Sequence, residues 1–171
     1  MAKGGNTKKK TRMNPLPIIA GAVVLIAALA LILPRLIQQD AETAAVVSDG
    51  QDLVIQAAEI NETASYFDCD VDGITVQVLA VRASDNTIRL ALNTCQVCNG
   101  SPYAYFEQEG DVFICQNCKN RFASTDVGVV AGGCNPVPIT AETYLEQNGT
   151  ITVPADFLAE NAVRFRNWKK F

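Results

Sequence analysis

The sequence predicts a mainly β fold, a β-rich α+β ectodomain attached to one N-terminal transmembrane helix. Short runs of β-branched and aromatic residues alternate with turn residues from residue 53 onward. Two C-x-x-C pairs stand in the middle of that region, in the spacing typical of a zinc-ribbon or rubredoxin-like site built from two cysteine-bearing turns, or knuckles. An apolar run with basic residues before it precedes the whole region.

The apolar run predicts a membrane anchor. Leu16–Leu33 is 18 residues long, and as a helix it would span about 27 Å, close to the thickness of a hydrocarbon core. The basic residues before it should stay cytoplasmic, so we expect a single-pass protein of the cell membrane with its C-terminal domain extracytoplasmic. A cleaved signal peptide is the alternative. The expected segments are a basic cytoplasmic tail at 1–14, a transmembrane helix at 15–37, a linker at 38–52 and a cysteine-rich metal-binding domain at 53–171.

Charge is distributed unevenly along the chain. Six of the 14 basic residues precede residue 38, whereas all 18 acidic residues follow it, so residues 38–171 carry a formal charge of −10. An acidic domain of this kind argues against nucleic acid as a partner and is compatible with attracting cations. Solubility is the simpler explanation for most of these carboxylates.

The domain begins with three predicted strands in an antiparallel meander. Asp72-Gly73 and Ser84-Asp85-Asn86 separate them, and these are residue types that accept turn geometry. The middle strand is rich in β-branched residues, which suits a half-buried strand. The predicted strands are Tyr66–Val71, Ile74–Arg82 and Thr87–Leu92.

A hairpin is predicted between the two cysteine pairs, because the strand-like runs Tyr103–Phe106 and Val112–Ile114 flank a turn at residues 109–111. This hairpin would bring the two pairs together. Towards the C-terminus, Asn148-Gly149 predicts the end of a short helix over residues 141–147. After that helix, the sequence predicts a strand at Thr150–Val153 and a last helical turn opened by Pro154.

The cysteine spacing is the strongest functional signal. Cys95 and Cys98 form one pair, and Cys115 and Cys118 form the other after 16 intervening residues. A two-residue gap lets one tight turn aim two sulfurs at one ion, so two such turns complete a tetrahedron. Cys134 follows two glycines that allow the backbone to approach closely. It is either an additional ligand that can replace one of the four or a buried small side chain.

The residue types that are missing narrow the choice of metal. The chain has no His, and both Met residues precede the apolar run, which excludes a His-ligated zinc, copper or haem site. No His follows either C-x-x-C pair, which excludes covalent haem attachment. An all-thiolate site remains, and it can hold zinc, mononuclear iron or an iron–sulfur cluster.

Residues beside the cysteines have expected supporting roles. Lys119 and Arg121 would offset the negative charge of a tetrathiolate site, or form an exposed basic pair. Cys69 shares a strand face with Phe67 and Val71, so a buried thiol is expected there. Five aromatic side chains are expected to pack around the site and keep it dry: Tyr103, Tyr105, Phe106, Phe113 and Phe122.

Several motifs together resemble the FtrD-like family of membrane iron–sulfur-containing proteins, over the segment from Tyr66 to Ile139. They are Asp72-Gly73 before a Val-rich strand, Ile88-Arg89, Asn93–Cys98, Glu109–Asp111, Ile114–Cys118, Arg121-Phe122 and Gly132–Pro136, of which the last is the most specific. The resemblance implies iron or an iron–sulfur cluster as cofactor, with zinc as the alternative. It also implies transition-metal uptake or associated electron transfer, beside a metal-transport or redox partner in the membrane. Many members have several membrane spans ahead of this domain, whereas one is predicted here.

The residues themselves leave two other functions open. A thiol–disulfide oxidoreductase would use either C-x-x-C pair as its catalytic pair, although the βαβ context of thioredoxin-like proteins is missing. A structural zinc ribbon would use the thiolates only to stabilise a domain that binds a partner protein. A hydrolase is not indicated, because the sequence has no His-based triad and no phosphate-binding glycine loop.

Overall fold

The structure is a computed structural model that describes residues 50–171. The predicted cytoplasmic tail, the predicted transmembrane helix and nearly all of the predicted linker lie outside the described residues. Among residues 50–171, no helix has the length and apolar character needed to cross a membrane. The described part of the chain consists of three antiparallel sheets, one α-helix and short 3₁₀ turns. The prediction of a β-rich domain is therefore confirmed.

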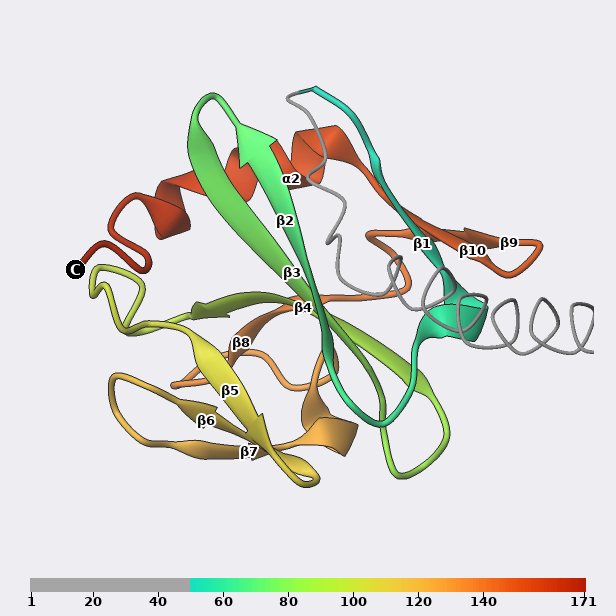
Figure 1. Cartoon of the computed structure of the whole chain (residues 1–171), viewed down its shortest axis with the longest axis horizontal. Helices are drawn as coiled ribbons and strands as arrows, with labels where there is room; N and C mark the ends of the chain where they lie inside the picture. Colours follow the sequence, from blue (N-terminus) through green and yellow to red (C-terminus); the bar gives the residue numbers. More distant parts are fainter. Residues whose placement is uncertain (1–49) are drawn as a thin grey trace, which may run out of the picture. The chain divides into compact units, whose positions relative to one another are not determined.

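A four-stranded sheet in the order β2-β3-β4-β8 forms the centre of the domain (Figure 1). The predicted meander is confirmed, and Asp72 and Gly73 have the positive φ angles of 51° and 75° that a two-residue hairpin turn requires. The third strand continues past its predicted end at Leu92 to Cys95, so the first cysteine is part of the central sheet. The strands are β2 (Ser65–Val71), β3 (Ile74–Arg82), β4 (Ile88–Cys95) and β8 (Pro136–Ile139).

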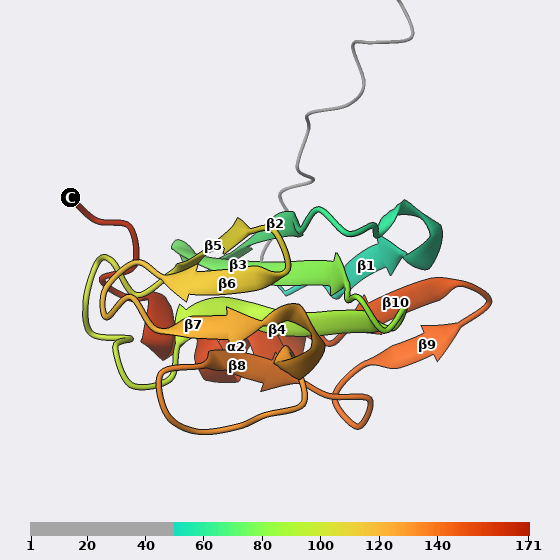
Figure 2. The ribbon, with the colours of Figure 1, turned by 90° about the horizontal axis from the view of Figure 1, so that it is seen from below.

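A three-stranded sheet in the order β5-β6-β7 carries the second cysteine pair (Figures 1 and 2). The predicted hairpin is confirmed, but the prediction that its first strand begins at Tyr103 is wrong. Residues 101–105 instead bridge the two knuckles, because the Cys95 N–H donates to the Ala104 carbonyl at 2.9 Å and the Gln116 N–H donates to the Tyr105 carbonyl at 2.8 Å. The strands are β5 (Phe106–Glu109), β6 (Val112–Cys115) and β7 (Arg121–Ala123).

The third sheet has the order β1-β10-β9. The predicted helix over residues 141–147 is wrong, because Leu145–Gln147 pairs with β10 as a strand. Asn148 and Gly149 have φ angles of 53° and 75° and form the turn of this hairpin. A left-handed Asn-Gly pair suits a helix end and a hairpin turn alike, and the pairing with β10 selects the hairpin. The strands are β1 (Leu53–Gln56), β9 (Leu145–Gln147) and β10 (Thr150–Val153).

The C-terminal segment covers one face of the central sheet. Helix α2 (Ala155–Asn161) begins after Pro154, which confirms the predicted helical turn, and a 3₁₀ turn at Ala162–Phe165 continues it. Leu158, Phe165 and Trp168 are buried in the same apolar cluster as side chains from β1, β10 and one face of the central sheet. The Trp168 indole N–H donates to the Asn93 carbonyl at 2.8 Å, which ties the C-terminus to β4.

The central sheet is buried on both faces, and the two faces have separate cores. Val78 and Ala80 of β3 belong to the cluster under α2, whereas Leu79 and Val81 belong to a second cluster. Strand side chains alternate between the two faces of a sheet. Because both faces of β3 are covered by other parts of the domain, the strand contains a continuous apolar run. The second cluster contains Cys95, Cys115 and the aromatic side chains of the β5–β6–β7 sheet, and this face carries the candidate metal centre.

Candidate metal centre

Strand ends and pairing bring five cysteines to one place. Cys95 is the last residue of β4 and Cys115 the last residue of β6, so a turn carrying a second cysteine follows each strand. Pro136 at the start of β8 pairs with Cys95 across a register shift in β4. The fifth cysteine, two residues before Pro136, therefore arrives beside the first knuckle.

Four of the five predicted ligands form a compact group. The Sγ atoms of Cys95, Cys98, Cys118 and Cys134 all lie within 4.8 Å of one another. Cys115 is not in this group. It is fully buried, whereas Cys98 and Cys134 are half-buried and Cys118 is exposed. The fifth cysteine is thus part of the four-sulfur group, and the first cysteine of the second pair is not.

The four-sulfur group suits a tetrahedral thiolate-bound ion. Metal–sulfur bonds of about 2.3 Å place the sulfurs of a tetrahedral site about 3.8 Å apart, and the sulfurs of the observed group lie within 4.8 Å of one another. Thiolates are soft ligands shared by zinc, mononuclear iron and iron–sulfur sites. The donor chemistry therefore fits the metals expected from the sequence.

Backbone N–H groups point at a sulfur in both knuckles. The Cys98 N–H donates to the Cys95 sulfur at 3.4 Å, and the Val97 N–H also donates to it. In the second knuckle, the N–H groups of Asn117 and Cys118 donate to the Cys115 sulfur in the same way. Such bonds stabilise the charged form of a thiolate and tune the sites that thiolates form.

The sulfurs differ in how readily they lose a proton. Burial raises the pKa of both Cys95 and Cys115. The hydrogen bond between the Cys134 thiol and Cys118 raises the pKa of Cys134 to about 11. Burial also acts to raise the pKa of Cys118, but the Asn120 N–H and the neighbouring thiols donate to its sulfur, and the net effect is a lowered pKa. Among Cys95, Cys115, Cys118 and Cys134, Cys118 is thus the one whose pKa is lowered rather than raised.

The inner side of the site is apolar. Three of the five aromatic residues expected around it, Phe106, Phe113 and Phe122, are buried in the same cluster as Cys95 and Cys115. The expectation is wrong for the other two. Tyr103 is 49% exposed and stacks against the C-terminal ring, and Tyr105 packs against the cluster on the other face of the sheet. Both tyrosines lie in the segment that bridges the knuckles rather than in a strand.

Lys119 and Arg121 form contacts with other side chains, and Cys69 lies apart from the other cysteines. The Lys119 ammonium donates to the Gln116 side chain at 3.0 Å, and Arg121 forms an exposed ion pair with Glu109 at 3.4 Å. Cys69 is buried in the cluster under α2, where burial raises the pKa of its thiol to about 11. The predicted buried thiol is confirmed, and it lies on the sheet face that does not carry the other cysteines.

The loop that carries Cys134 is anchored by a glycine that sequence reasoning did not identify. Gly128 has a φ of 72°, and a Cβ at this position would lie 2.7 Å from the Leu90 carbonyl oxygen and 3.3 Å from that of Ile139. Both contacts are backbone atoms of the central sheet, so no side-chain movement can relieve them. Glycine at position 128 lets the loop lie directly against β4 and β8.

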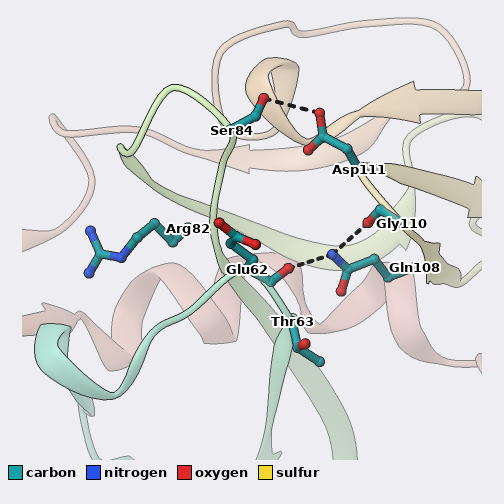
Figure 3. A pocket seen from close by; sticks show the side chains of 7 residues that line it. All are labelled: Glu62, Thr63, Arg82, Ser84, Gln108, Gly110 and Asp111. Carbon is teal, nitrogen blue, oxygen red and sulfur yellow. Dashed lines mark hydrogen bonds between the residues drawn. The ribbon is translucent and has the colours of Figure 1, made fainter.

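A polar cavity of about 660 Å³ lies between the β5–β6 turn and the loop after β3 (Figure 3). Two of its polar side chains, Asp111 and Gln108, have partners within the protein. Asp111 accepts hydrogen bonds from Ser84 and Ser124, and the Gln108 side-chain amide donates to the Glu62 and Gly110 carbonyls. These bonds join the hairpin to the central sheet, and a structural role explains them.

The fold and the cysteine group together define a class of protein, a β-rich domain with an all-thiol group that can hold a metal ion. Residues 45–165 match the family described as membrane iron-sulfur containing protein FtrD-like, and the chain belongs to this family. The match confirms the resemblance and extends beyond the motifs that indicate it. No curated protein and no solved structure matches the chain.

Proposed function

We propose that this chain is a membrane-anchored, extracytoplasmic protein that binds iron, as an ion or an iron–sulfur cluster, in transition-metal uptake or associated electron transfer. The observation that carries the proposal is the group of four sulfurs within 4.8 Å, formed by Cys95, Cys98, Cys118 and Cys134. Membership of a family described as membrane iron-sulfur containing supports iron over zinc. The acidic charge of residues 38–171 is compatible with attracting cations.

The four cysteines would hold the metal, and a thiolate-bound iron centre supplies one-electron redox chemistry when present. The buried Cys95 and the aromatic cluster behind it exclude water from the inner side. The exposed Cys118 leaves the outer side open, and Val97, 64% exposed in the first knuckle, adds an apolar contact surface there. The contrast between a buried side and an exposed side supports exchange of electrons or metal with a membrane partner at the exposed side.

Elemental analysis with visible absorption spectroscopy tests the proposal, on the full chain purified anaerobically in detergent. We expect iron, with thiolate charge-transfer absorption in the visible range, and acid-labile sulfide in addition if a cluster forms. The matched control is the Cys98→Ala variant, which should lose both metal and colour. One colourless zinc per chain would instead support the structural zinc ribbon.

The proposed topology has a separate test. A reporter that is active only in the cytoplasm should be active when fused at the N-terminus and inactive when fused after Phe171. The opposite pattern would contradict the predicted orientation of the anchor.

Thiol–disulfide exchange is a second candidate, and the state of Cys118 favours it. This exposed sulfur has a lowered pKa and lies within 4.8 Å of the Cys134 sulfur. The Cys118 thiolate would attack a partner disulfide and form a mixed disulfide; Cys134 would then displace the partner, which leaves as a dithiol, while Cys118 and Cys134 become a disulfide. A metal-free purified protein that reduces a disulfide substrate stoichiometrically would select this function.

A further inference from the structure

The loop that presents Cys134 is held mainly by one side chain of the first knuckle. The Gln96 side-chain amide donates to the Pro136 carbonyl at 3.0 Å, and its side-chain oxygen accepts from the Gly132 N–H at 3.0 Å. The Gln96 backbone N–H donates to the Asn135 carbonyl at 3.0 Å. These three bonds enclose Cys134 on both sides along the chain.

The loop has little else to fix its shape. Gly132 and Gly133 have φ angles of 89° and 63°, and space is open around both positions. Two consecutive glycines in the left-handed region lose more conformational entropy on ordering than other residues do. One further bond holds the segment, from the Asn120 side chain to the Cys134 carbonyl at 3.1 Å. The Gln96 side chain makes the bonds to Gly132 and Pro136, whereas the bond to Asn135 comes from the backbone and does not depend on that side chain.

The second knuckle has a glutamine at the matching position, and it does not make such contacts. The Gln116 side chain donates to the Ile114 carbonyl at 3.1 Å and accepts from the Lys119 ammonium at 3.0 Å. Both partners lie within the same knuckle and its strand. The two C-Q-x-C motifs therefore place the same side chain in different roles, and Gln116 provides an internal control for Gln96.

We propose that Gln96 is a positioning residue that holds Cys134 in place as the fourth sulfur of the metal site. The inference rests on the proposed metal-binding function and deepens it. The hydrogen bonds of the Gln96 side chain go to backbone groups and not to a sulfur. Gln96 therefore acts by holding the Gly132–Pro136 segment, so that the Cys134 sulfur stays within 4.8 Å of the other three. Cys115 remains buried, outside the group.

Cobalt(II) binding to the full chain in detergent tests this inference, because thiolate-to-cobalt absorption reports the number of thiolates on the ion. Loss of a residue that orients a ligand typically costs 10- to 100-fold in metal affinity. We expect Gln96→Ala to weaken cobalt binding by about 10-fold or more and to lower the charge-transfer absorption per ion to that of Cys134→Ser. Gln116→Ala should bind cobalt as the wild type does.

The double variant Gln96→Ala/Cys134→Ser separates positioning from a general loss of stability. If Gln96 acts through Cys134, the double variant should bind cobalt with the affinity of Cys134→Ser within about twofold. A further loss of affinity in the double variant, or a Gln96→Ala spectrum identical to that of the wild type, would overturn the inference while leaving the metal site intact. A wild-type chain that binds no cobalt would contradict the proposed function itself.

Discussion

The two knuckles have the same motif, C-Q-x-C, and different roles. The first contributes both of its sulfurs to the four-sulfur group, and its glutamine reaches across to the Cys134 loop. The second contributes only Cys118, while Cys115 is buried and its glutamine bonds within its own turn. What surrounds each knuckle explains the difference, because β8 pairs beside β4 and brings Cys134 to the first knuckle. A repeated motif thus does not imply that its cysteines take equivalent positions.

The backbones of the knuckles also differ. Lys119, directly after the second knuckle, has a φ of 62° and takes the left-handed conformation usual for glycine at this position. Asn99, the matching residue of the first knuckle, is not among the described residues with positive φ. Its side chain instead donates to the Gln96 carbonyl at 2.6 Å, and the turn continues to Ser101. Of the two knuckles, the second is thus the one followed by a residue in the left-handed conformation.

The largest expected difference in metal binding is between two variants that each lack one cysteine, Cys98→Ala in the first knuckle and Cys115→Ala in the second. Cys98→Ala should weaken metal binding by about 1,000-fold, roughly a quarter of the binding free energy of a structural four-ligand zinc site. Cys115→Ala should keep one metal ion per chain, because Cys115 is outside the four-sulfur group. Metal stoichiometry and competition with a chelator measure both. Equal losses in the two variants would show that Cys115 is a ligand.

A glycine substitution in the loop that carries Cys134 should have the next largest effect. Gly128→Ala combines left-handed strain with a clash against backbone, so it should lower the free energy of unfolding by about 3 kcal/mol. Gly110→Ala, at the turn between β5 and β6, has a φ of 60° but open space around it. This control should cost about 1 kcal/mol. Urea unfolding of the metal-free chain measures both, and similar values would mean that the loop is free to move off the sheet.

The pH dependence of metal binding should distinguish the sulfurs. The pKa of Cys134 is raised to about 11, so its thiol is protonated near neutral pH and must release a proton when a metal binds. Affinity should therefore rise with pH between about pH 6 and 8. In Cys134→Ser the slope of log affinity against pH should fall by about one proton, whereas Cys115→Ala should keep it. Cobalt titrations at several pH values provide the measurement, and an unchanged slope in Cys134→Ser would exclude Cys134 as a thiolate ligand.

The smallest expected effect concerns the residue after each knuckle. Lys119→Gly should raise the free energy of unfolding by about 0.5 kcal/mol, since relief of left-handed strain exceeds the added freedom of the unfolded chain. Asn99→Gly should lower it by about 0.5–1 kcal/mol, because glycine adds freedom there without relieving strain. Denaturant unfolding resolves the sign of each change. Stabilisation by both would mean that the two backbones are alike.

The sequence predicted local structure well where one residue pattern had one physical meaning. The β3 strand follows from its β-branched run, and the Asp72-Gly73 turn from its need for positive φ. It failed where one pattern serves two structures. Asn148-Gly149 suits a helix end and a hairpin, and Tyr103–Tyr105 has the composition of a strand but bridges the knuckles before β5 begins. Pairing with distant segments settled both cases.

For the site, the spacing of the cysteines in the sequence was enough to predict five candidate ligands, and the missing His was enough to require thiolates. Their division into a group of four and a buried fifth depends on long-range pairing. The register between β4 and β8 brings Cys134 to Cys95, and Gln96 holds it there. No local pattern contains this information, because Gln96 and Gln116 are the same residue in the same motif. What differs is the chain packed beside each of them.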